Sequence, residues 1–449
     1  MPLATTTSSS ISSYLHPRRR RNAVVAPRCE AAQREEIVIV GAGVAGLATA
    51  VSLRRLGVGA TVLEQGAALR AGGTSLTLFK NGWRVLDAIG VADELRAKHL
   101  RIQGMKMRSA SAAAATDVLR EFSFEEEAPG QEVRAVERRA LLEALASRLP
   151  PGAISFSSKL RRVAGQGGPD GATELELEDG RRIVARVVVG CDGVNSPIAR
   201  WMGFSEPRYV GHMAFRGLAR YDGDGAGGGQ PFEAKVNYIY GRGLRAGFVP
   251  VSATRVYWFI CFNRPTPGPK ITDPAALKRE ALDLVRGWPE DLVAVMRDTP
   301  EDAVVRTPLV DRWLWPGLAP AASRGGVVLA GDAWHPMTPN LGQGACCALE
   351  DAVVLARRLA AAAGAAGSAA GASYGEAMRE YERERWWRVF PLTARAGLVG
   401  ALVQWGNPAV CAARDGVVIP RLVRLGPFLE HTNFDCGLLE PPATAAPLP

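Results

Sequence analysis

The chain has few of the residues from which metal centres and disulfide frameworks are built. Its seven cysteines form no CxxC motif, and its five histidines form no HExxH or HxH pattern. The adjacent Cys346 and Cys347 do not have the spacing of metal ligands either. The sequence therefore predicts no metal site, and it predicts that the cysteines are reduced and buried.

Long apolar runs are also missing. Residues 37–53 are uncharged but contain three glycines, and residues 396–413 are uncharged but contain Gly406, Asn407 and Pro408. Neither run reaches the roughly 20 predominantly apolar residues that a membrane span needs. We therefore expect no transmembrane segment, although the apolar character of the second run leaves peripheral contact with a membrane surface open.

Acidic residues are absent from residues 1–29, which hold five arginines and many serines and threonines. This composition is typical of an organellar transit peptide. Serine and threonine dominate the first half and arginine appears late, which favours the chloroplast over the mitochondrion. A disordered or nucleic-acid-binding basic tail is the alternative. Without these five arginines the net charge of +9 falls to +4, so no nucleic-acid partner is expected for the rest of the chain.

The chain is too long for a single hydrophobic core, because 449 residues exceed what one core usually supports. Residues 36–40 and 60–64 are short β-branched runs on either side of a helical stretch at 42–56, which predicts a βαβ unit in a parallel sheet. Residues 327–330 return to this buried-strand pattern. The alternating stretches between 204 and 316 predict an inserted, mostly antiparallel β domain.

The predicted fold class is therefore α/β, with a discontinuous Rossmann-like dinucleotide-binding domain, an inserted β domain that supplies the substrate side, and C-terminal helices. The predicted parts are a leader (1–29), the first domain (36–203 and 325–358), the inserted domain (204–316), an Ala/Gly-rich loop (359–373) and a helical region (374–440). In that last region, Tyr381, Trp386, Trp387 and Phe390 are expected to be core contacts.

A glycine motif directly follows the first predicted strand. Gly41, Ala42, Gly43 and Gly46 belong to a GxGxxG pattern that opens a helix. Gly41 permits a tight turn, Gly43 lets the backbone approach a pyrophosphate, and Gly46 lets helix and strand pack closely. Glu64 closes the second strand, where an acid can bind a ribose hydroxyl and disfavours a 2′-phosphate. This context predicts an adenine dinucleotide site; a purely structural glycine turn is the alternative.

A second motif, GDAWHPMTPNLGQG, runs from Gly331 to Gly344 after an apolar strand. Asp332 would lie at the carboxyl end of that strand, where ligands of open α/β sheets bind. Residues 342–344 precede a helix, whose free N–H groups can stabilise negative charge on a reduced flavin. A simple helix cap at Gly342 is the alternative, and His335, which precedes Pro336, is interpreted as a packed loop residue.

A third stretch, Gly190 to Ser196 (GCDGVNS), also follows a strand, and by itself it indicates only a turn. In their order along the chain, which is GAGVAG, then CDGVNS, then GDAWHPMTPNLGQG, the three motifs resemble those of the FAD-dependent class A monooxygenases, the para-hydroxybenzoate hydroxylase group. The resemblance covers roughly residues 36 to 390. Within the group the chain is similar to a plant plastid branch, to zeaxanthin epoxidase and to bacterial urate and salicylate hydroxylases.

The resemblance implies an enzyme in which NADH or NADPH reduces FAD, the reduced flavin forms a C4a-hydroperoxide with O₂, and one oxygen atom passes to a substrate. It implies that FAD is bound by Gly41, Ala42, Gly43, Gly46, Glu64, Arg138, Asp192, Asp332, Pro339, Gly342, Gln343 and Gly344. It also implies that Pro336, Gly342 and Gln343 lie at the reacting centre. A second GxGxxG motif in the right context is missing, so the sequence offers no basis for choosing between NADH and NADPH.

The implied substrate is a small aromatic or heterocyclic compound. Its candidate contacts are Phe215, Arg216, Gly217, Tyr238 and Tyr240 in the inserted domain, although each of these also suits ordinary sheet packing. Two other functions stay open. One is a different flavin oxidoreductase, such as an epoxidase or reductase of a lipid-like substrate, and the other is an FAD-binding scaffold without turnover.

Deleting residues 1–29 tests the transit-peptide hypothesis. The deletion should abolish import into isolated chloroplasts and leave the FAD content of the purified protein unchanged, because the glycine motif begins only at Gly41. Import assays with chloroplasts and mitochondria in parallel separate the two organelles. Import that survives the deletion contradicts the hypothesis.

Overall fold

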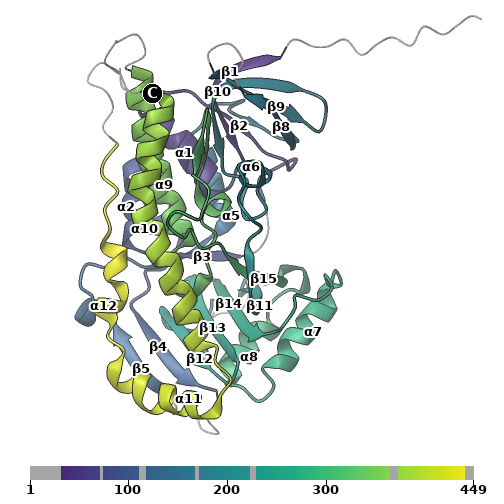
Figure 1. The fold of residues 1–449 in the computed structure, drawn as a ribbon. Helices are drawn as coiled ribbons and strands as arrows, with labels where there is room; N and C mark the ends of the chain where they lie inside the picture. Colours follow the sequence, from purple (N-terminus) through teal and green to yellow (C-terminus); the bar gives the residue numbers. More distant parts are fainter. Residues whose placement is uncertain are drawn as a thin grey trace, which may run out of the picture.

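The computed structural model describes residues 32–70, 74–110, 118–166, 171–222, 229–364 and 373–439. The leader predicted at residues 1–29 lies outside this part of the chain. Two sheets lie one above the other in the view of Figure 1, and a long C-terminal helix runs past both. The predicted α/β class is confirmed.

The first sheet has eight strands in the described chain. Its main path runs β16-β17-β10-β1-β2-β7, and β9 and β8 continue from β10. The pairs β17–β10, β10–β1, β1–β2 and β2–β7 are parallel, as the βαβ pattern predicts. The bounds are β1 (Gln33–Val40), β2 (Thr61–Leu63), β7 (Ile154–Ser155), β8 (Leu160–Gln166), β9 (Thr173–Leu177), β10 (Arg182–Gly190), β16 (Ser323–Arg324) and β17 (Val327–Leu329).

Helices pack around this sheet in one large hydrophobic core. They are α1 (Val44–Arg55), α2 (Lys80–Ile89), α3 (Ala92–Lys98), α5 (Arg138–Ala146), α6 (Pro197–Trp201) and α9 (Gly344–Gly364). The 3₁₀ turns η3 (Gly331–Ala333) and η4 (Pro339–Leu341) connect β17 to α9. The core places α1 beside α9, so the two predicted ligand-binding helices lie next to each other.

The second sheet has seven strands in the order β15-β11-β14-β13-β12-β4-β5. Adjacent strands of this sheet are antiparallel, except that β12 and β4 are parallel. One face packs on α7 (Pro274–Leu284) and α8 (Glu290–Arg297). The strand bounds are β4 (Gly104–Ser109), β5 (Val118–Ser123), β11 (Arg208–Arg220), β12 (Lys235–Tyr240), β13 (Leu244–Ser252), β14 (Arg255–Asn263) and β15 (Val305–Asp311). A small sheet of β3 (Ser75–Leu78) and β6 (Arg134–Glu137) lies between the two large ones.

Two predicted boundaries need correction. Residues 104–109 and 118–123 were assigned to the first domain, but they form β4 and β5 of the second sheet, because β4 pairs with β12 far along the chain. The Ala/Gly-rich loop was predicted to begin at residue 359, but α9 continues to Gly364, since alanine is the strongest helix former. Residues 365–372 lie outside the described chain.

The C-terminal region is helical, as predicted. It comprises α10 (Tyr374–Val403), α11 (Pro408–Ala413), a π-helical segment (Arg414–Leu422) and α12 (Leu425–Leu429). Short turns at Phe124–Glu127 (α4), Glu301–Ala303 and Glu430–Asn433 complete the described helices. Tyr381 is buried and donates a hydrogen bond to the carbonyl of Leu329. The expectation that Trp387 is a core contact is wrong, because its side chain is 75% exposed on the outer face of α10.

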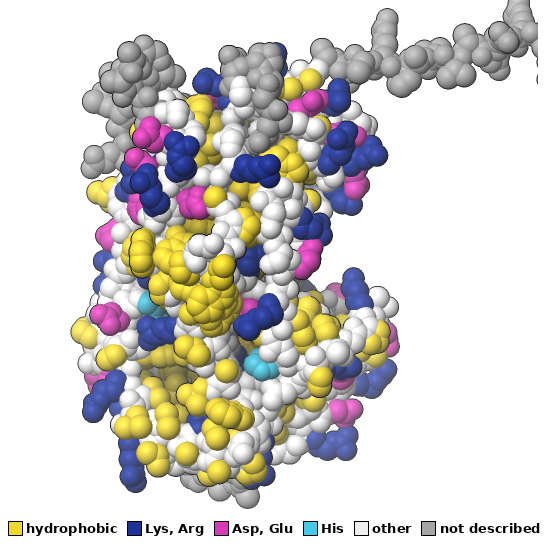
Figure 2. Space-filling view, in the orientation of Figure 1, with side chains coloured by type: hydrophobic (Ala, Val, Ile, Leu, Met, Phe, Trp, Pro, Cys, Tyr) yellow, Lys and Arg dark blue, Asp and Glu magenta, His cyan; other side chains and the backbone are white. Residues whose placement is uncertain are grey.

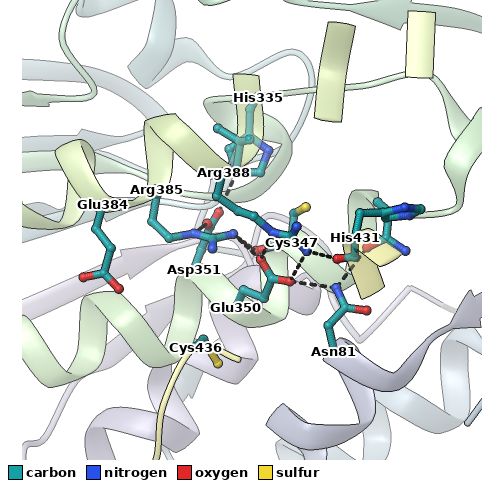
Figure 3. A network of polar contacts seen from close by, with 12 residues as sticks. Asn81, His335, Cys347, Glu350, Asp351, Glu384, Arg385, Arg388, His431 and Cys436 are labelled. Carbon is teal, nitrogen blue, oxygen red and sulfur yellow. Dashed lines mark hydrogen bonds and ion pairs between the residues drawn. The ribbon is translucent and has the colours of Figure 1, made fainter. Parts of the chain in front are cut away.

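A buried ionic network holds α10 against α9 (Figure 3). Arg385 pairs with Asp351 at 2.7 Å and with Glu350 at 2.7 Å, and Arg388 pairs with Glu350 at 2.9 Å. Asp351 also contacts His335 Nε2 at 2.6 Å. All five side chains are buried or nearly so, and the two carboxylates balance the two guanidinium groups.

Pairing keeps both carboxylates ionised. Burial raises the pKa of Asp351, but His335 and Arg385 together hold it below the ordinary value. Burial likewise raises the pKa of Glu350, and Arg385 and Arg388 outweigh this effect. Both groups therefore contribute stability above about pH 4, and this contribution is lost as the pH falls.

Arg385→Met should lower the free energy of unfolding by about 3–5 kcal/mol, because it removes the guanidinium that the two buried carboxylates share. The matched control is Arg358→Met on the neighbouring helix, where Arg358 forms half-exposed pairs with Glu380 and Glu384. That control should cost about 0–1 kcal/mol. Urea titrations of both variants provide the comparison, and equal losses would contradict a stabilising role for the network.

Candidate active site

The first glycine turn joins β1 to α1 at the carboxyl edge of the first sheet. Gly41 has φ +107°, and a Cβ there would lie 2.4 Å from the carbonyl oxygen of Cys191. A Cβ at Gly46 would lie 1.9 Å from the carbonyl oxygen of Gly41, so the turn and α1 touch through backbone atoms. By contrast, a Cβ at Gly43 would meet no atom within 4 Å. The backbone at Gly43 therefore faces open space beside a helix N-terminus.

Glu64 follows β2 directly and lies against this turn. Its carboxylate accepts hydrogen bonds from the backbone N–H groups of Ala42, at 2.9 Å, and Gly66, at 2.8 Å. Because β1 and β2 are parallel neighbours, their carboxyl ends meet at one edge. The acid is thus held at the position where the sequence pattern places a ribose contact.

Two further acids lie at the same edge. Asp192 follows β10 and Asp332 follows β17, and these strands are parallel neighbours in the sheet. Burial raises the pKa of Asp192 to about 6, and its Oδ1 atom has no hydrogen-bond partner. The side chain of Asp332 is exposed, yet the protein that surrounds it raises its pKa as well. An exposed side chain with a raised pKa is what we expect of a carboxylate that faces a recess in the protein.

Arg138 begins α5 and approaches these acids. Burial lowers its pKa, and the nearby carboxylates of Asp332 and Glu64 act in the opposite direction. The Nε atom of Arg138 is buried and has no hydrogen-bond partner among the described residues. A partly buried guanidinium with an unused, buried donor atom suits a bound anionic ligand.

The loop before α9 brings the second motif to the same edge. Gly342 has φ +63°, and a Cβ there would lie 2.8 Å from the ring of Phe79. Gln343 is buried, and its side-chain oxygen accepts a hydrogen bond from Asn81 at 2.9 Å, which leaves Nε2 without a partner. Asn81 also donates to Glu350 at 2.7 Å. Figure 3 shows Asn81 beside Glu350, and through Asn81 the ionic network reaches Gln343, the residue before α9.

The same loop contacts the second sheet. Asn340 accepts a hydrogen bond from Arg245 of β13, and it donates to the carbonyl of Ala396 in α10 at 2.8 Å. Pro336 is buried, and its carbonyl accepts a hydrogen bond from the backbone of Arg312 at 2.9 Å. Pro339 is exposed at the first position of η4. The loop is thus fixed from three sides.

The sheet face opposite α7 and α8 carries aromatic rings and cations. Tyr238 lies against Phe259 with ring centroids 5.9 Å apart, and Phe259 lies 6.3 Å from Tyr257. Burial raises the pKa of Tyr257 to about 12, so its hydroxyl is protonated and can donate a hydrogen bond. Arg245 and Arg216 alternate with core residues on β13 and β11, and Arg216 donates to Thr307 at 2.9 Å.

Of the predicted substrate contacts, Phe215 and Gly217 lie on the other face. Phe215 is fully buried and stacks on Phe262 at 5.6 Å within the core formed with α7 and α8. A Cβ at Gly217 would lie 2.5 Å from the ring of Trp258 in the same core. The two-residue period of a strand turns Arg216, between them, to the opposite face. Tyr240 is buried, and the guanidinium of Arg414 lies over its ring.

His335 has a structural role, as interpreted from the sequence, because its contact with Asp351 belongs to the buried network. Residues 32–70, 74–110, 118–166, 171–222, 229–364 and 373–439 contain no cluster of three His, Cys, Asp or Glu side chains that could hold a metal ion. The six cysteines of these ranges are free and buried, as predicted. None of the described helices is long and apolar enough to cross a membrane.

Sequence reasoning missed the partners that position the motif. Arg385 lies on the buried face of α10, which continues through Met378, Tyr381, Val389 and Leu392 at spacings of three or four. A cation on such an apolar face requires a buried carboxylate, so this signal was available. Asn81 and Arg245 carry no such signal, since their partners lie far away in the sequence.

Comparisons with known proteins agree with this geometry. The model of the FAD binding domain family matches residues 34–385. Monooxygenase 2 of Arabidopsis thaliana is 37% identical over 90% of this chain and 98% of its own length. The 3-amino-4-hydroxybenzoate 2-monooxygenase PtnB3 of Streptomyces platensis is 32% identical over 79% and 85%. The crystal structure of Klebsiella pneumoniae HpxO complexed with FAD and uric acid has the same fold, with TM-score 0.74 and 23% identity over 89% and 96%.

Asp192→Asn should make the stability of the FAD-free protein less dependent on pH. With a folded pKa near 6 and an ordinary value of 3.8, the folded state holds a proton between these values that the unfolded state has lost. Wild-type stability therefore falls as the pH rises through this window. The variant should gain about 1–3 kcal/mol over the wild type between about pH 4 and pH 7.

This gain is measured from the melting temperatures of the wild type and of Asp192→Asn at about pH 4 and pH 7. The matched control is Asp302→Asn, which replaces an exposed acid away from the sheet edge. A difference between wild type and Asp192→Asn that stays constant with pH would show that burial does not perturb this carboxyl.

Proposed function

The chain belongs to the FAD binding domain family and, within it, to the FAD-dependent monooxygenases, and we propose that it uses NADH or NADPH and O₂ to hydroxylate a small aromatic or heterocyclic substrate. This proposal rests on the contact between the cofactor side and the substrate side of the molecule. The ligand-binding edge of the first sheet faces the aromatic and cationic face of the second sheet, and the hydrogen bond from Arg245 to Asn340 joins them.

The residues at the sheet edge fit FAD. The open backbone at Gly43 can receive a pyrophosphate at the N-terminus of α1, as free N–H groups there favour anions. Glu64 and Asp332 can accept hydrogen bonds from ribose and ribityl hydroxyls. Three buried polar atoms without partners, on Arg138, Asp192 and Gln343, are further contacts that a ligand would satisfy.

FAD, when bound, would supply the redox chemistry by accepting hydride from the nicotinamide nucleotide and by reacting with O₂. The chain's own contribution is orientation and electrostatics. The first N–H groups of α9, after Gly342 and Gln343, have no intrahelical partner and lie at the positive end of a helix of 21 residues. They would stabilise negative charge on a reduced flavin ring.

The second sheet would hold the substrate and exclude water. Tyr238, Tyr257 and Phe259 offer an aromatic surface, which favours a planar ring. Arg216 and Arg245 favour a substrate with an anionic or strongly accepting group. This chemistry agrees with the uric acid held by the Klebsiella structure and with the aminohydroxybenzoate named for the Streptomyces relative. Delivery to the plastid through the N-terminal leader belongs to the same proposal.

Stopped-flow absorbance tests the reaction. Flavin reduction is recorded while NADH and then NADPH are added, with phenolic, purine and carotenoid-like compounds as candidate substrates. We expect one compound class to accelerate flavin reduction and a hydroxylated product to form with consumption of O₂. A protein that binds FAD but is reduced by neither nucleotide under any of these conditions would be a scaffold or would use another electron donor.

Asp332→Ala should yield folded protein with little bound FAD. Losing a carboxylate that binds hydroxyl groups costs about 1.5–3 kcal/mol of binding energy, which corresponds to roughly 10- to 100-fold weaker FAD binding. Flavin absorbance after gel filtration measures the occupancy, and circular dichroism verifies the fold. Asp302→Ala, an exposed acid outside the site, is the control. Stoichiometric flavin in Asp332→Ala would remove this residue from the binding role.

A further inference from the structure

The outer face of α10 carries an apolar stripe that nothing in the described chain covers. The stripe consists of Trp387, Pro391, Ala394, Leu398, Leu402 and Trp405, spaced by three or four residues. This spacing keeps the residues from Trp387 to Leu402 on one side of the helix over about 22 Å, and Trp405 lies just beyond the end of the helix at Val403. Trp387, Leu398, Leu402 and Trp405 are all exposed large hydrophobic side chains.

Neighbouring elements extend the stripe. Trp315 and Leu318 are exposed beside it, and the ring of Trp315 lies 5.5 Å from that of Phe390 in α10. A shallow recess of about 220 Å³ opens here between Trp315, Trp334 and Trp386. Figure 2 shows hydrophobic side chains gathered on the face that α10 crosses. Contiguous apolar surface of this kind marks an interaction site rather than ordinary exposure.

The segment that carries the stripe is rich in arginine and poor in acids, and the acid that lines the neighbouring recess, Glu382, accepts hydrogen bonds from the backbone of Ala322 and Ser323. From Trp387 to Pro427 the only acid is Asp415, and it is paired with Arg414 at 2.6 Å. Arg383 lies one turn before Trp387, and Arg421 and Arg424 follow the stripe. All three are exposed, and none forms an ion pair with any residue that the structure describes.

We propose that this face docks the protein onto a membrane surface that contains anionic lipids. Tryptophan and leucine side chains would enter the boundary between headgroups and acyl chains, where amphipathic tryptophan is favoured. The three free arginines would lie against lipid phosphates, which supply the negative charge that the stripe lacks. The proposal concerns a surface outside the site and does not depend on the proposed reaction.

A second copy of the chain is a poorer occupant. In a symmetric dimer the same patch contacts itself, so its arginines would meet a surface on which Glu382 and Asp415 already have partners. A membrane satisfies both the apolar stripe and the arginines at once. Charge complementarity therefore favours the lipid surface.

Flotation with vesicles tests the proposal on the full chain. The probes are vesicles of phosphatidylcholine alone and of phosphatidylcholine with phosphatidylglycerol. The wild type should float with the anionic vesicles, and salt should weaken the binding because it screens exposed charges. The double variant Leu398→Glu/Leu402→Glu should bind at least about tenfold more weakly, because it places acids where apolar side chains enter the lipid.

The matched control is Leu438→Glu, since Leu438 is 69% exposed and Leu398 is 67% exposed, but Leu438 lies outside the stripe. It should bind like the wild type. All variants keep the five arginines of residues 1–29, so any attraction of that segment to lipid is the same in each. Bound FAD and the melting temperature provide evidence of folding for each variant, independent of lipid.

Two results would overturn the proposal. One is a wild type that does not float with anionic vesicles, or a double variant that binds these vesicles as strongly as the wild type does. The other is a concentration-dependent dimer in analytical ultracentrifugation that the double variant abolishes, which would assign the stripe to a second copy instead.

Discussion

Burial of two carboxylates and two guanidinium groups between α9 and α10 is the constraint on which the rest of the site depends. Asp351 accepts a hydrogen bond from the backbone of Gly331, at the start of the second motif, and contacts His335 farther along it. Glu350 reaches Gln343 through Asn81. The same charges that join the helices therefore hold both ends of the loop that would face the flavin. Apolar side chains could join the helices as firmly, but they could not orient these polar groups.

The second constraint is the contact between the two sheets. Arg245 lies on β13, and its partner Asn340 lies in the loop before α9, so the substrate side and the cofactor side are joined by a side chain from each. Asn340 is itself held by the carbonyl of Ala396 in α10. The long helix thus takes part in both constraints. A shift of α10 would move the loop and the second sheet together.

Local patterns predicted those parts of the fold that depend on neighbours in sequence. The glycine turn, the strand before it and Glu64 are such parts, because the period of a strand and the demands of a tight turn are local. The sheet to which β4 belongs is not, since β4 pairs with β12 more than a hundred residues later. Its alternation of Met105, Lys106 and Met107 is that of any half-buried strand. The strand pattern around Arg216 also does not show whether Arg216 or its neighbours Phe215 and Gly217 face the site, because the sequence fits either orientation of the strand.

The misplacement of Trp387 has a different cause. Two faces of α10 show apolar residues at helical spacing, one through Tyr381, Val389 and Leu392 and one through Trp387, Leu398 and Leu402. Hydrophobicity alone favours the second face as the core, because the first contains Arg385. The structure buries the first face, since the acids of α9 satisfy that charge. The ion pairs of Arg385 therefore decide which face of α10 is buried, and the apolar stripe stays exposed. The helix thus has two faces that need a partner, one for its charge and one for its exposed apolar side chains.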